Sequence, residues 1–328
     1  MCFWWIIVET KEKYRELCKK EQSIPIFSRD CWLDATAGVD NWDVVLVEKG
    51  GEVVASMPYM ISKRHGFYSI CQPVLTQKLG PWIKYPPGQK YDKKLSYENK
   101  LFKELISKLP KVDRMSTCFD YNITNWLPFY WEGFNQTTRY TYVIEDLGDV
   151  EKIFHEMASD MRTKIRKAEK RVIVKECFDV DLAYSINKMT FDRQNKKIPY
   201  SLDMFKRISE ACFAHDAGKI FIAEDVDGNK HGMSFMVYDE NCAYYLIGGG
   251  NTKYRNSAAQ DLLMWHMIKE ASNVTKKFDF EGTMLPTVNK TFRSFGTVQK
   301  SYHSISKIYS KKLKIATCLR EAILTLLR

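Results

Sequence analysis

The feature that most constrains this 328-residue sequence is a strand-like run that ends in three glycines and leads into a helical pattern. Residues 244–250 (YYLIGGG) are typical of a strand, and residues 256–272 have the apolar spacing of a helix. A strand that feeds a helix leaves N–H groups without partners at the positive end of the helix dipole. Glycines let a ligand approach the backbone, so this segment predicts a site for a phosphate or a carbonyl oxygen. An ordinary glycine-rich loop is the alternative.

Two acidic residues follow that helical pattern. In residues 278–282 (FDFEG), Asp279 and Glu281 are two positions apart, which places both on the same face of a strand. A carboxylate at the end of a strand can take the proton of an attacking amine or hold the amine in place. We predict that Glu281, nearer the strand end, is the general base and that Asp279 assists it. Hydrogen-bonded structural acids are the alternative.

A basic segment precedes both features. Residues 161–171 (MRTKIRKAEKR) hold six cations and one acid, and on a helix Arg162 and Arg166 share one stripe while Lys164 lies on another with Lys167 and Arg171. Such a face predicts a clamp for the phosphates of a nucleotide donor or of RNA, with Arg162, Lys164 and Arg166 as the contacts. The formal net charge of +10 agrees with an anionic partner. A solvated charged surface is the alternative.

The two halves of the chain follow the same order of elements. Each has a hairpin around a glycine turn, a third strand, a helix, a strand containing Phe-Asp and a closing strand. Phe119-Asp120 in the first half corresponds to Phe278-Asp279 in the second. We therefore expect an α/β protein of two domains, residues 1–146 and residues 147–310, followed by a basic amphipathic helix at residues 311–328.

Several segments have patterns that indicate their local structure. Residues 1–8 are apolar and are expected to form a strand or a buried segment, and residues 150–171 are expected to form one long helix. The aromatic residues 126–131 (WLPFYW) are expected to pack as a loop, with a substrate groove as the alternative. Residues 311–328 are expected to dock on the protein, with an anionic membrane surface as the alternative.

Cysteine and histidine usage argues against two kinds of site. Nine cysteines and six histidines are scattered without ligand spacing, so we predict neither a disulfide framework nor a metal site. No segment approaches the length needed to cross a bilayer, and residues 1–8 lack the features of a signal peptide. We therefore expect a cytoplasmic protein. Peripheral contact with the inner face of the membrane is compatible with that expectation.

The combination of these motifs resembles a known family. The order YYLIGGG, YRNSAAQDLLMWHMIKEAS, FDFEGTM and NKTFRSFG is similar to the FemAB-like branch of the GNAT superfamily. The resemblance covers nearly the whole chain and is densest over residues 189–307. It implies tandem GNAT-like domains, each a mixed central sheet flanked by helices, with a degenerate first domain and a catalytic second one. It also implies transfer of an acyl or aminoacyl group to an amine.

The resemblance also assigns residues to roles. In the FRSFG motif, Arg293 stands where the family often carries a lysine near the transferring carbonyl, and an arginine keeps the charge but not the shape. The sequence has no heptad run for the coiled-coil arm of tRNA-using members, and Arg255 begins a turn that lacks the glycines of the usual acetyl-CoA site. The residues that would hold the donor are Tyr245, Gly248, Gly249, Gly250, Tyr254, Arg255 and Asn256.

These observations lead to one predicted reaction and two alternatives. The prediction is an acyltransferase without a metal, which moves an acyl group from acyl-CoA to an amine of a cell-envelope sugar or peptide precursor. The N–H groups of residues 248–250 stabilise the oxyanion, and Glu281, with Asp279 and Arg293 nearby, completes the catalytic group. The alternatives are a FemAB-type enzyme that uses aminoacyl-tRNA, and a non-catalytic module that binds a phosphate or glycan at the membrane surface.

Overall fold

The protein was analysed as a computed structural model, which describes residues 2–326. The chain forms two compact units. Unit 1 comprises Met1–Glu21, Phe27–Thr138 and Tyr302–Arg328, and unit 2 comprises Gln22–Ile26 and Arg139–Ser301. The chain leaves unit 1 within strand β6 (Asn135–Ile144) and returns to it within strand β12 (Val298–Ile308). Each unit thus receives part of both strands.

Unit 1 is built on a mixed sheet. Its strands follow the order β1 (Trp42–Lys49), β2 (Glu52–Arg64), β3 (Phe67–Cys71), β5 (Arg114–Cys118) and β12, and β4 (Trp82–Ile83) pairs with β2. The predicted glycine hairpin is confirmed, because Gly50 and Gly51 join β1 to β2 with φ values of 59° and 83°. Helix α3 (Tyr91–Lys108) buries its apolar side chains against this sheet.

The expectation of a strand at residues 1–8 is wrong. These residues begin helix α1 (Cys2–Lys20), on which Tyr14 and Cys18, four positions apart, are buried. The apolar start of the chain is therefore part of an amphipathic helix. A 3₁₀ helix, η1 (Ile26–Ser28), and helix α2 (Asp30–Ala37) follow along the chain.

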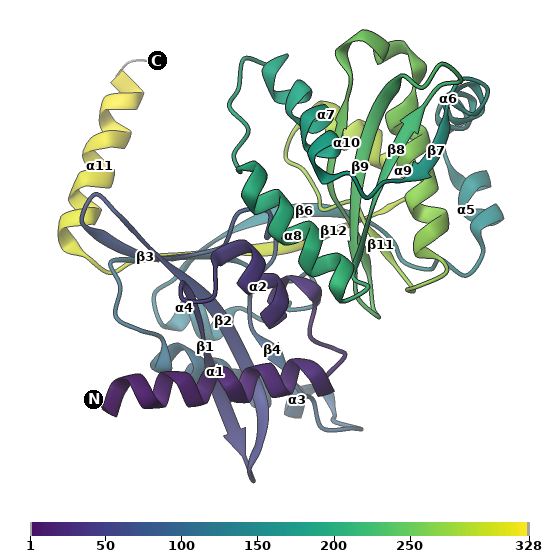
Figure 1. The fold of residues 1–328 in the computed structure, drawn as a ribbon. Coiled ribbons are helices and arrows are strands. Elements are labelled where there is room, and N and C mark those ends of the chain that lie inside the picture. The colour runs from purple at the N-terminus through teal and green to yellow at the C-terminus, as the bar shows by residue number, and fades with distance from the viewer. Residues whose placement is uncertain (1, 327–328) are drawn as a thin grey trace. The chain divides into compact units, whose positions relative to one another are not determined.

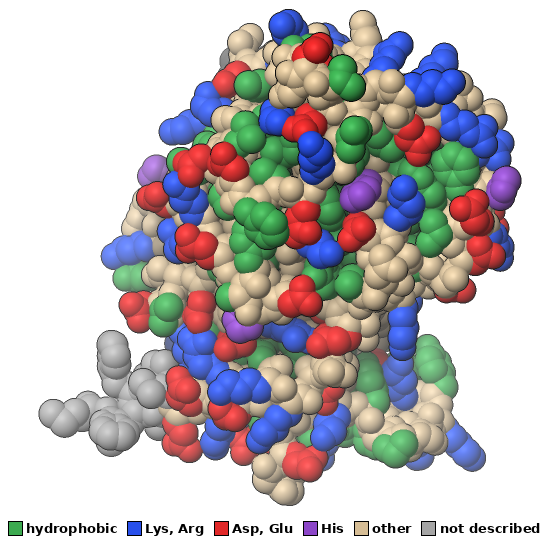
Figure 2. All heavy atoms as spheres, turned by 45° about the vertical axis from the view of Figure 1, so that its right-hand side comes forward, with side chains coloured by type: hydrophobic (Ala, Val, Ile, Leu, Met, Phe, Trp, Pro, Cys, Tyr) green, Lys and Arg blue, Asp and Glu red, His purple; other side chains and the backbone are tan. Residues whose placement is uncertain are grey.

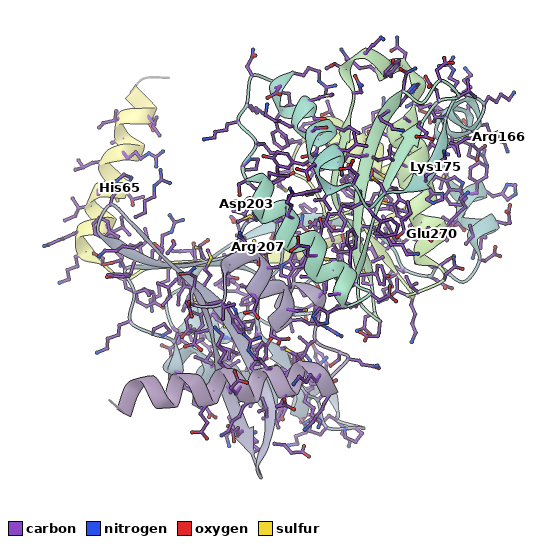
Figure 3. The ribbon with its side chains drawn as sticks, viewed as in Figure 1. His65, Arg166, Lys175, Asp203, Arg207 and Glu270 are labelled. Atoms are coloured by element: carbon purple, nitrogen blue, oxygen red, sulfur yellow. The ribbon has the colours of Figure 1, made fainter. Side chains whose placement is uncertain are left out.

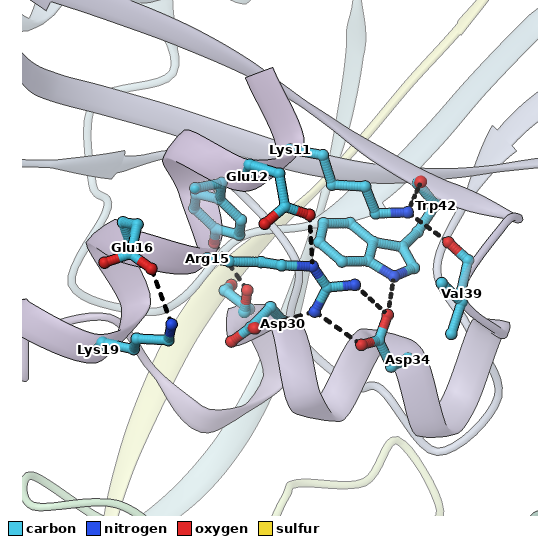
Figure 4. Close-up of polar contacts among 11 residues, drawn as sticks. Lys11, Glu12, Arg15, Glu16, Lys19, Asp30, Asp34, Val39 and Trp42 are labelled. Atoms are coloured by element: carbon cyan, nitrogen blue, oxygen red, sulfur yellow. Dashed lines mark hydrogen bonds and ion pairs between the residues drawn. The ribbon is translucent and has the colours of Figure 1, made fainter. Parts of the chain in front are cut away.

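An ion-pair network joins α1 to α2 and β1 (Figure 4). Arg15 on α1 donates from Nη1 to Asp30 at 3.0 Å and from both Nη atoms to Asp34 at 2.8 and 3.0 Å. The indole Nε1 of Trp42 also donates to Asp34, at 2.8 Å. These carboxylates raise the pKa of Arg15. A bidentate arginine–carboxylate pair that is partly shielded from water holds the first helix in one orientation.

Unit 2 contains the remaining strands of the same sheet. Its strands follow the order β6, β11 (Phe278–Asp279), β10 (Ala243–Gly250), β9 (Lys230–Tyr238), β8 (Gly218–Glu224) and β7 (Ile173–Glu176). Helix α9 (Ala259–Ala271) covers one face of this sheet, and α7 (Val180–Asp192) and α8 (Leu202–Ala214) cover the other (Figure 1). Helix α10 (Pro286–Arg293) packs through Phe292 against Phe280 and Tyr245.

The basic segment is two helices rather than one. Helix α5 (Val150–Glu156) ends at Met157, and α6 (Ser159–Glu169) begins after Ala158. Both connecting residues are extended, with ψ values of 151° and 143°. Met157 is buried, and the N–H of Ala158 donates to Ser294 at 2.9 Å. Burial of Met157 and this tertiary bond therefore outweigh the helical propensity of the segment.

Two further expectations in unit 1 are corrected. The aromatic segment at residues 126–131 contains a short helix, α4 (Leu127–Trp131), with a proline in its first turn. The amphipathic helix exists as α11 (Lys311–Leu326), but it does not dock through its apolar side, because 60% of Leu319 is exposed to solvent. Among the described residues, no helix is long and apolar enough to span a bilayer.

Candidate functional site

The strands β10 and β11 of unit 2 run parallel and then separate. They pair only at Ala243 with Phe278 and at Tyr244 with Asp279. Beyond this point β10 continues to Gly250 alongside β9, whereas Phe280 donates its N–H to Tyr142 on β6 at 2.9 Å. The pairing of β10 with β9 shifts register between Tyr245 and Ile247, at the point of separation. Bulges of this kind bend a strand and redirect its side chains.

The three glycines form the end of β10, as the sequence predicted. Gly248, Gly249 and Gly250 pair with residues of β9, and a 3₁₀ helix, η2 (Thr252–Ser257), separates them from α9. Close packing explains why Gly248 and Gly249 have no side chain. A Cβ on Gly248 would lie 1.9 Å from the hydroxyl oxygen of Tyr245, and a Cβ on Gly249 would lie 2.6 Å from Cα of Asn187. The prediction of a strand that ends in these glycines and is followed by a helix is therefore confirmed, with η2 between the strand and the helix.

Side chains of α7 bind backbone groups of β10. Asn187 donates from Nδ2 to the carbonyl oxygen of Gly248 at 3.0 Å, and the N–H of Gly250 donates to Oγ1 of Thr190 at 3.1 Å. The Oδ1 of the fully buried Asn187 accepts a hydrogen bond from the hydroxyl of Tyr200 at 2.6 Å. The N–H of Gly250, one of the expected oxyanion donors, is thus engaged by the protein.

Tyr245 occupies the bulge and points toward α9 and α10. Its ring meets Phe292 edge to face at 6.1 Å, and its hydroxyl lies 3.5 Å from Nε2 of Gln260. Gln260 also donates to Ser234 at 2.7 Å. Burial raises the pKa of Tyr245 to about 12, so its hydroxyl keeps its proton at neutral pH. A protonated hydroxyl at this position can donate a hydrogen bond to a ligand.

The turn that leads into α9 has a left-handed residue, a conformation that favours glycine, but the residue there is alanine. Ala258 is left-handed, with φ 58° and ψ 23°, directly before the first residue of α9. Tyr254 stacks on His231 with ring centroids 4.2 Å apart, Arg255 is exposed, and Asn256 accepts a hydrogen bond from Nη1 of Arg171 at 2.8 Å. The structure therefore brings Asn256 close to a cation and gives Tyr254 a packing partner.

The stacked His231 is the second residue of β9, beside the turn that joins β8 to β9. Its Nε2 lies 3.0 Å from Oδ2 of Asp225. Hydrogen bonds from Asn229 are the largest cause that brings the pKa of Asp225 down to about 2, and the bond to His231 adds to them. This turn is consequently held together by a carboxylate that stays ionised at neutral pH.

The two predicted acids have different surroundings. Asp279 is fully buried, and its Oδ1 accepts hydrogen bonds from the hydroxyl of Thr141 and from the N–H of Glu281, the latter at 2.8 Å. These bonds fit the structural interpretation of Asp279. Glu281 is partly buried and left-handed, with φ 60°, as is Gly282 with φ 63°. A left-handed residue other than glycine is uncommon, and turns and functional sites are among the places where such residues occur.

The predicted phosphate contacts are divided between two places. Arg162 donates to the carbonyl oxygen of His155 at 2.8 Å, and the guanidinium of Arg166, labelled in Figure 3, lies 5.3 Å from the ring centroid of Phe154, so both side chains contact α5. Lys164 lies near α9, because its charge offsets part of the rise that burial causes in the pKa of Asp261. Lys164 lies 4.0 Å from Asp160 on its own helix, and of the three predicted cations it is the one whose charge acts on a residue of α9.

Arg171 was not among the predicted phosphate contacts, yet it lies beside the start of α9. Its bond to Asn256 brings it to the turn before α9. The helical stripe shared by Lys164 and Arg171 was the available signal in the sequence. On the face drawn in Figure 2, lysine and arginine side chains are interspersed with acidic ones, so the net positive charge is not gathered into a single patch there.

Arg293 ends helix α10, and its side chain is exposed. The neighbouring Phe292 is the residue of that motif that packs against Tyr245, at 6.1 Å between ring centroids. Within residues 2–326, no group of three histidine, cysteine or acidic side chains gathers in a way that could hold a metal ion.

Comparisons with known proteins agree with this geometry. Residues 155–283 match the family described as acetyltransferase (GNAT) domain. The solved structure of FemX has 12% identity to this chain and a TM-score of 0.65, and the match covers 90% of this chain and 95% of FemX. The chain has the fold of the FemAB-like branch of the GNAT superfamily. The expected tandem GNAT-like α/β architecture is thereby confirmed.

Other solved structures share this FemAB-like fold at low identity. L-PGS from Bacillus licheniformis has 10% identity and a TM-score of 0.54, with 95% of this chain and 96% of that chain covered. A conserved protein of unknown function from Bacteroides thetaiotaomicron has 12% identity and a TM-score of 0.56, with 92% and 97% covered. No curated protein matches the sequence.

Proposed function

We propose that unit 2 transfers an acyl group from acyl-CoA to an amine on a cell-envelope sugar or peptide precursor. The observation that carries this proposal is the separation of β10 from β11 after Tyr244 and Asp279. In the GNAT superfamily the donor enters between strands that open in this way. The GNAT match over residues 155–283 supports the same class of reaction.

The proposed reaction needs a base and a group that stabilises negative charge. The amine nitrogen attacks the thioester carbonyl, a C–N bond forms, and the C–S bond breaks to release the CoA thiolate. Glu281 takes the proton that the amine loses. Backbone N–H groups of β10 stabilise the oxyanion, and because Gly250 is engaged by Thr190, we assign this role to the residues before it. The hydroxyl of Tyr245 donates a hydrogen bond to the bound acyl-CoA.

The phosphates of the donor are assigned to Lys164 and Arg171, at the start of α9. Arg171→Ala should weaken binding of acetyl-CoA by about tenfold, which is the size of one charge-assisted hydrogen bond. Arg162→Ala removes the same charge from a side chain that is bonded to α5 rather than to the turn before α9. Calorimetric titration of both variants tests the assignment. Equal losses in the two variants would argue against a donor at this turn.

The role of Glu281 is tested by an isosteric change. Glu281→Gln should lower the rate of thiol release from acetyl-CoA in the presence of an amine by about 10²–10⁴-fold and leave the donor-induced rise in melting temperature intact. Glu270→Gln is the matched control, because Glu270 pairs with Lys219 on the surface of α9 (Figure 3). Donor binding without turnover in the unmodified chain would instead identify a non-catalytic module that binds a phosphate or glycan.

Aminoacyl-tRNA is the second candidate donor. The resemblance of the sequence to the FemAB-like branch favours it, because that resemblance implies transfer of an acyl or aminoacyl group, and the solved structure of FemX shares the fold. Transfer from aminoacyl-tRNA should fall steeply with added salt and disappear with ribonuclease. Transfer that is indifferent to both treatments would leave acyl-CoA as the donor.

A further inference from the structure

Helix α11 carries an apolar stripe that faces solvent. Ile315, Leu319 and Ile323 lie four residues apart and therefore share one face of the helix, and they are 62%, 60% and 56% exposed. Single exposed apolar side chains are ordinary on a protein surface, whereas a continuous row of large ones marks a contact with another phase or molecule. Figure 1 shows α11, in yellow, standing away from the strands of unit 1.

The helix is oriented with this stripe outward. Leu313 and Thr317 are the partly buried residues among the described side chains of α11, and they lie on a different face from the stripe. A helix that simply covered the unit would bury its most apolar face. Here the apolar face is left outward, so the stripe is available to a partner.

The charges of α11 identify that partner. Lys311, Lys312, Lys314 and Arg320 are exposed, and the sequence of α11 has one acid, so its net charge is 4 − 1 = +3. On the helical projection Lys311 and Arg320 border the apolar stripe on its two sides. An apolar face with cations at its borders is the arrangement of helices that lie in the interface of an anionic bilayer.

We propose that α11 binds the surface of a membrane rich in anionic phospholipid. Ile315, Leu319 and Ile323 enter the boundary between headgroups and acyl chains, and Lys311 and Arg320 meet the lipid phosphates. The helix lies in the plane of the interface. This proposal does not depend on the acyl-transfer activity proposed for unit 2.

Flotation of the full chain with lipid vesicles tests the proposal. We expect the protein to float with vesicles of equimolar phosphatidylglycerol and phosphatidylcholine, and to float much less with phosphatidylcholine alone. Ile315→Ser with Leu319→Ser should weaken binding at least about a hundredfold, because two large apolar side chains lose their burial. Val226→Ser is the matched control, because Val226 is 93% exposed in a turn of unit 2.

A charge variant tests the second half of the proposal. Lys311→Gln with Arg320→Gln should weaken binding to the phosphatidylglycerol vesicles about twentyfold, at about fivefold for each cation. Neither pair of substitutions should change the melting temperature, since the side chains are exposed. The proposal is overturned if the chain does not float with the anionic vesicles, or if the serine pair floats as well as Val226→Ser. It is also overturned if sedimentation shows a dimer that the serine pair dissociates, because the stripe would then bind a second copy.

Discussion

The two hydrogen bonds made by the side chain of Asn187 allow a direct test of how α7 is attached to β10. Asn187→Ala removes the hydrogen bond to the carbonyl of Gly248, at 3.0 Å, and the one from the hydroxyl of Tyr200, at 2.6 Å. Both Asn187 and Tyr200 are buried, with 0% and 6% exposure, so water cannot easily replace the lost partner. The substitution therefore leaves a backbone carbonyl and a phenol hydroxyl without their partner.

The expected cost follows from these two groups. Each buried polar group left without a partner costs about 1–2 kcal/mol, which gives about 2–4 kcal/mol of unfolding free energy for Asn187→Ala. In a unit of this size that corresponds to a fall in melting temperature of roughly 4–16 °C. Tyr200→Phe removes one of the two bonds and should cost about half as much. The double variant should lose about 1 kcal/mol less than the sum, because both single changes break the same bond.

Thermal unfolding followed by circular dichroism measures these values. Asn273→Ala is the matched control, since Asn273 is exposed and its amide makes one bond of 3.4 Å to Lys269. This control should change the unfolding free energy by no more than about 0.5 kcal/mol. If Asn187→Ala falls no further than Asn273→Ala, or if the double variant is fully additive, the bridge from α7 to β10 is refuted.

Two substitutions at the start of α9 are expected to change the stability of the protein in opposite directions. Ala258→Gly should stabilise the protein by up to about 1 kcal/mol because it relieves a left-handed alanine, whereas Ala259→Gly, one residue later in the helix, should destabilise it by about 1 kcal/mol. Melting temperatures that move in the same direction would contradict the left-handed turn. Burial lowers the pKa of His266 below 6.5, so the unfolded chain takes up its proton first as the pH falls. The stability that this histidine contributes is thus complete above about pH 6.5 and is lost as the pH falls through the folded pKa, and His266→Gln should flatten the change in melting temperature between about pH 7.5 and pH 5.5.

The sequence predicted the elements that depend on local patterns. The hairpin at Gly50 and Gly51 and most helices and strands of unit 2 follow from turn residues and apolar spacing, which act over a few positions. The break between α5 and α6 could not be predicted in this way, because it depends on burial of Met157 and on a bond between Ala158 and Ser294. These partners lie far apart in the sequence.

The candidate site shows the same limit at the level of single residues. The glycines of β10 were recognised from the sequence. The sequence could not show why these positions must be glycine, which is the close approach of the side chain of Tyr245 and of the backbone of Asn187 on α7. The basic stripe was recognised as well, but its pattern could not show that Arg162 turns toward His155 while Arg171 turns toward Asn256. Periodicity places a side chain on a face, and only the packed neighbours decide what that side chain contacts.

The crossing of the chain within β6 and β12 has a consequence for biosynthesis. Strand β5 of unit 1 pairs with residues 304–308 of β12, which are translated only after the whole of Arg139–Ser301. At the usual speed of translation this delay is on the order of ten seconds. During that time the edge of β5, which includes Met115 and Thr117, has no strand to complete it, so the nascent chain exposes a pairing edge to its neighbours on the ribosome. Unit 2 can finish folding during translation, whereas unit 1 must wait for β12.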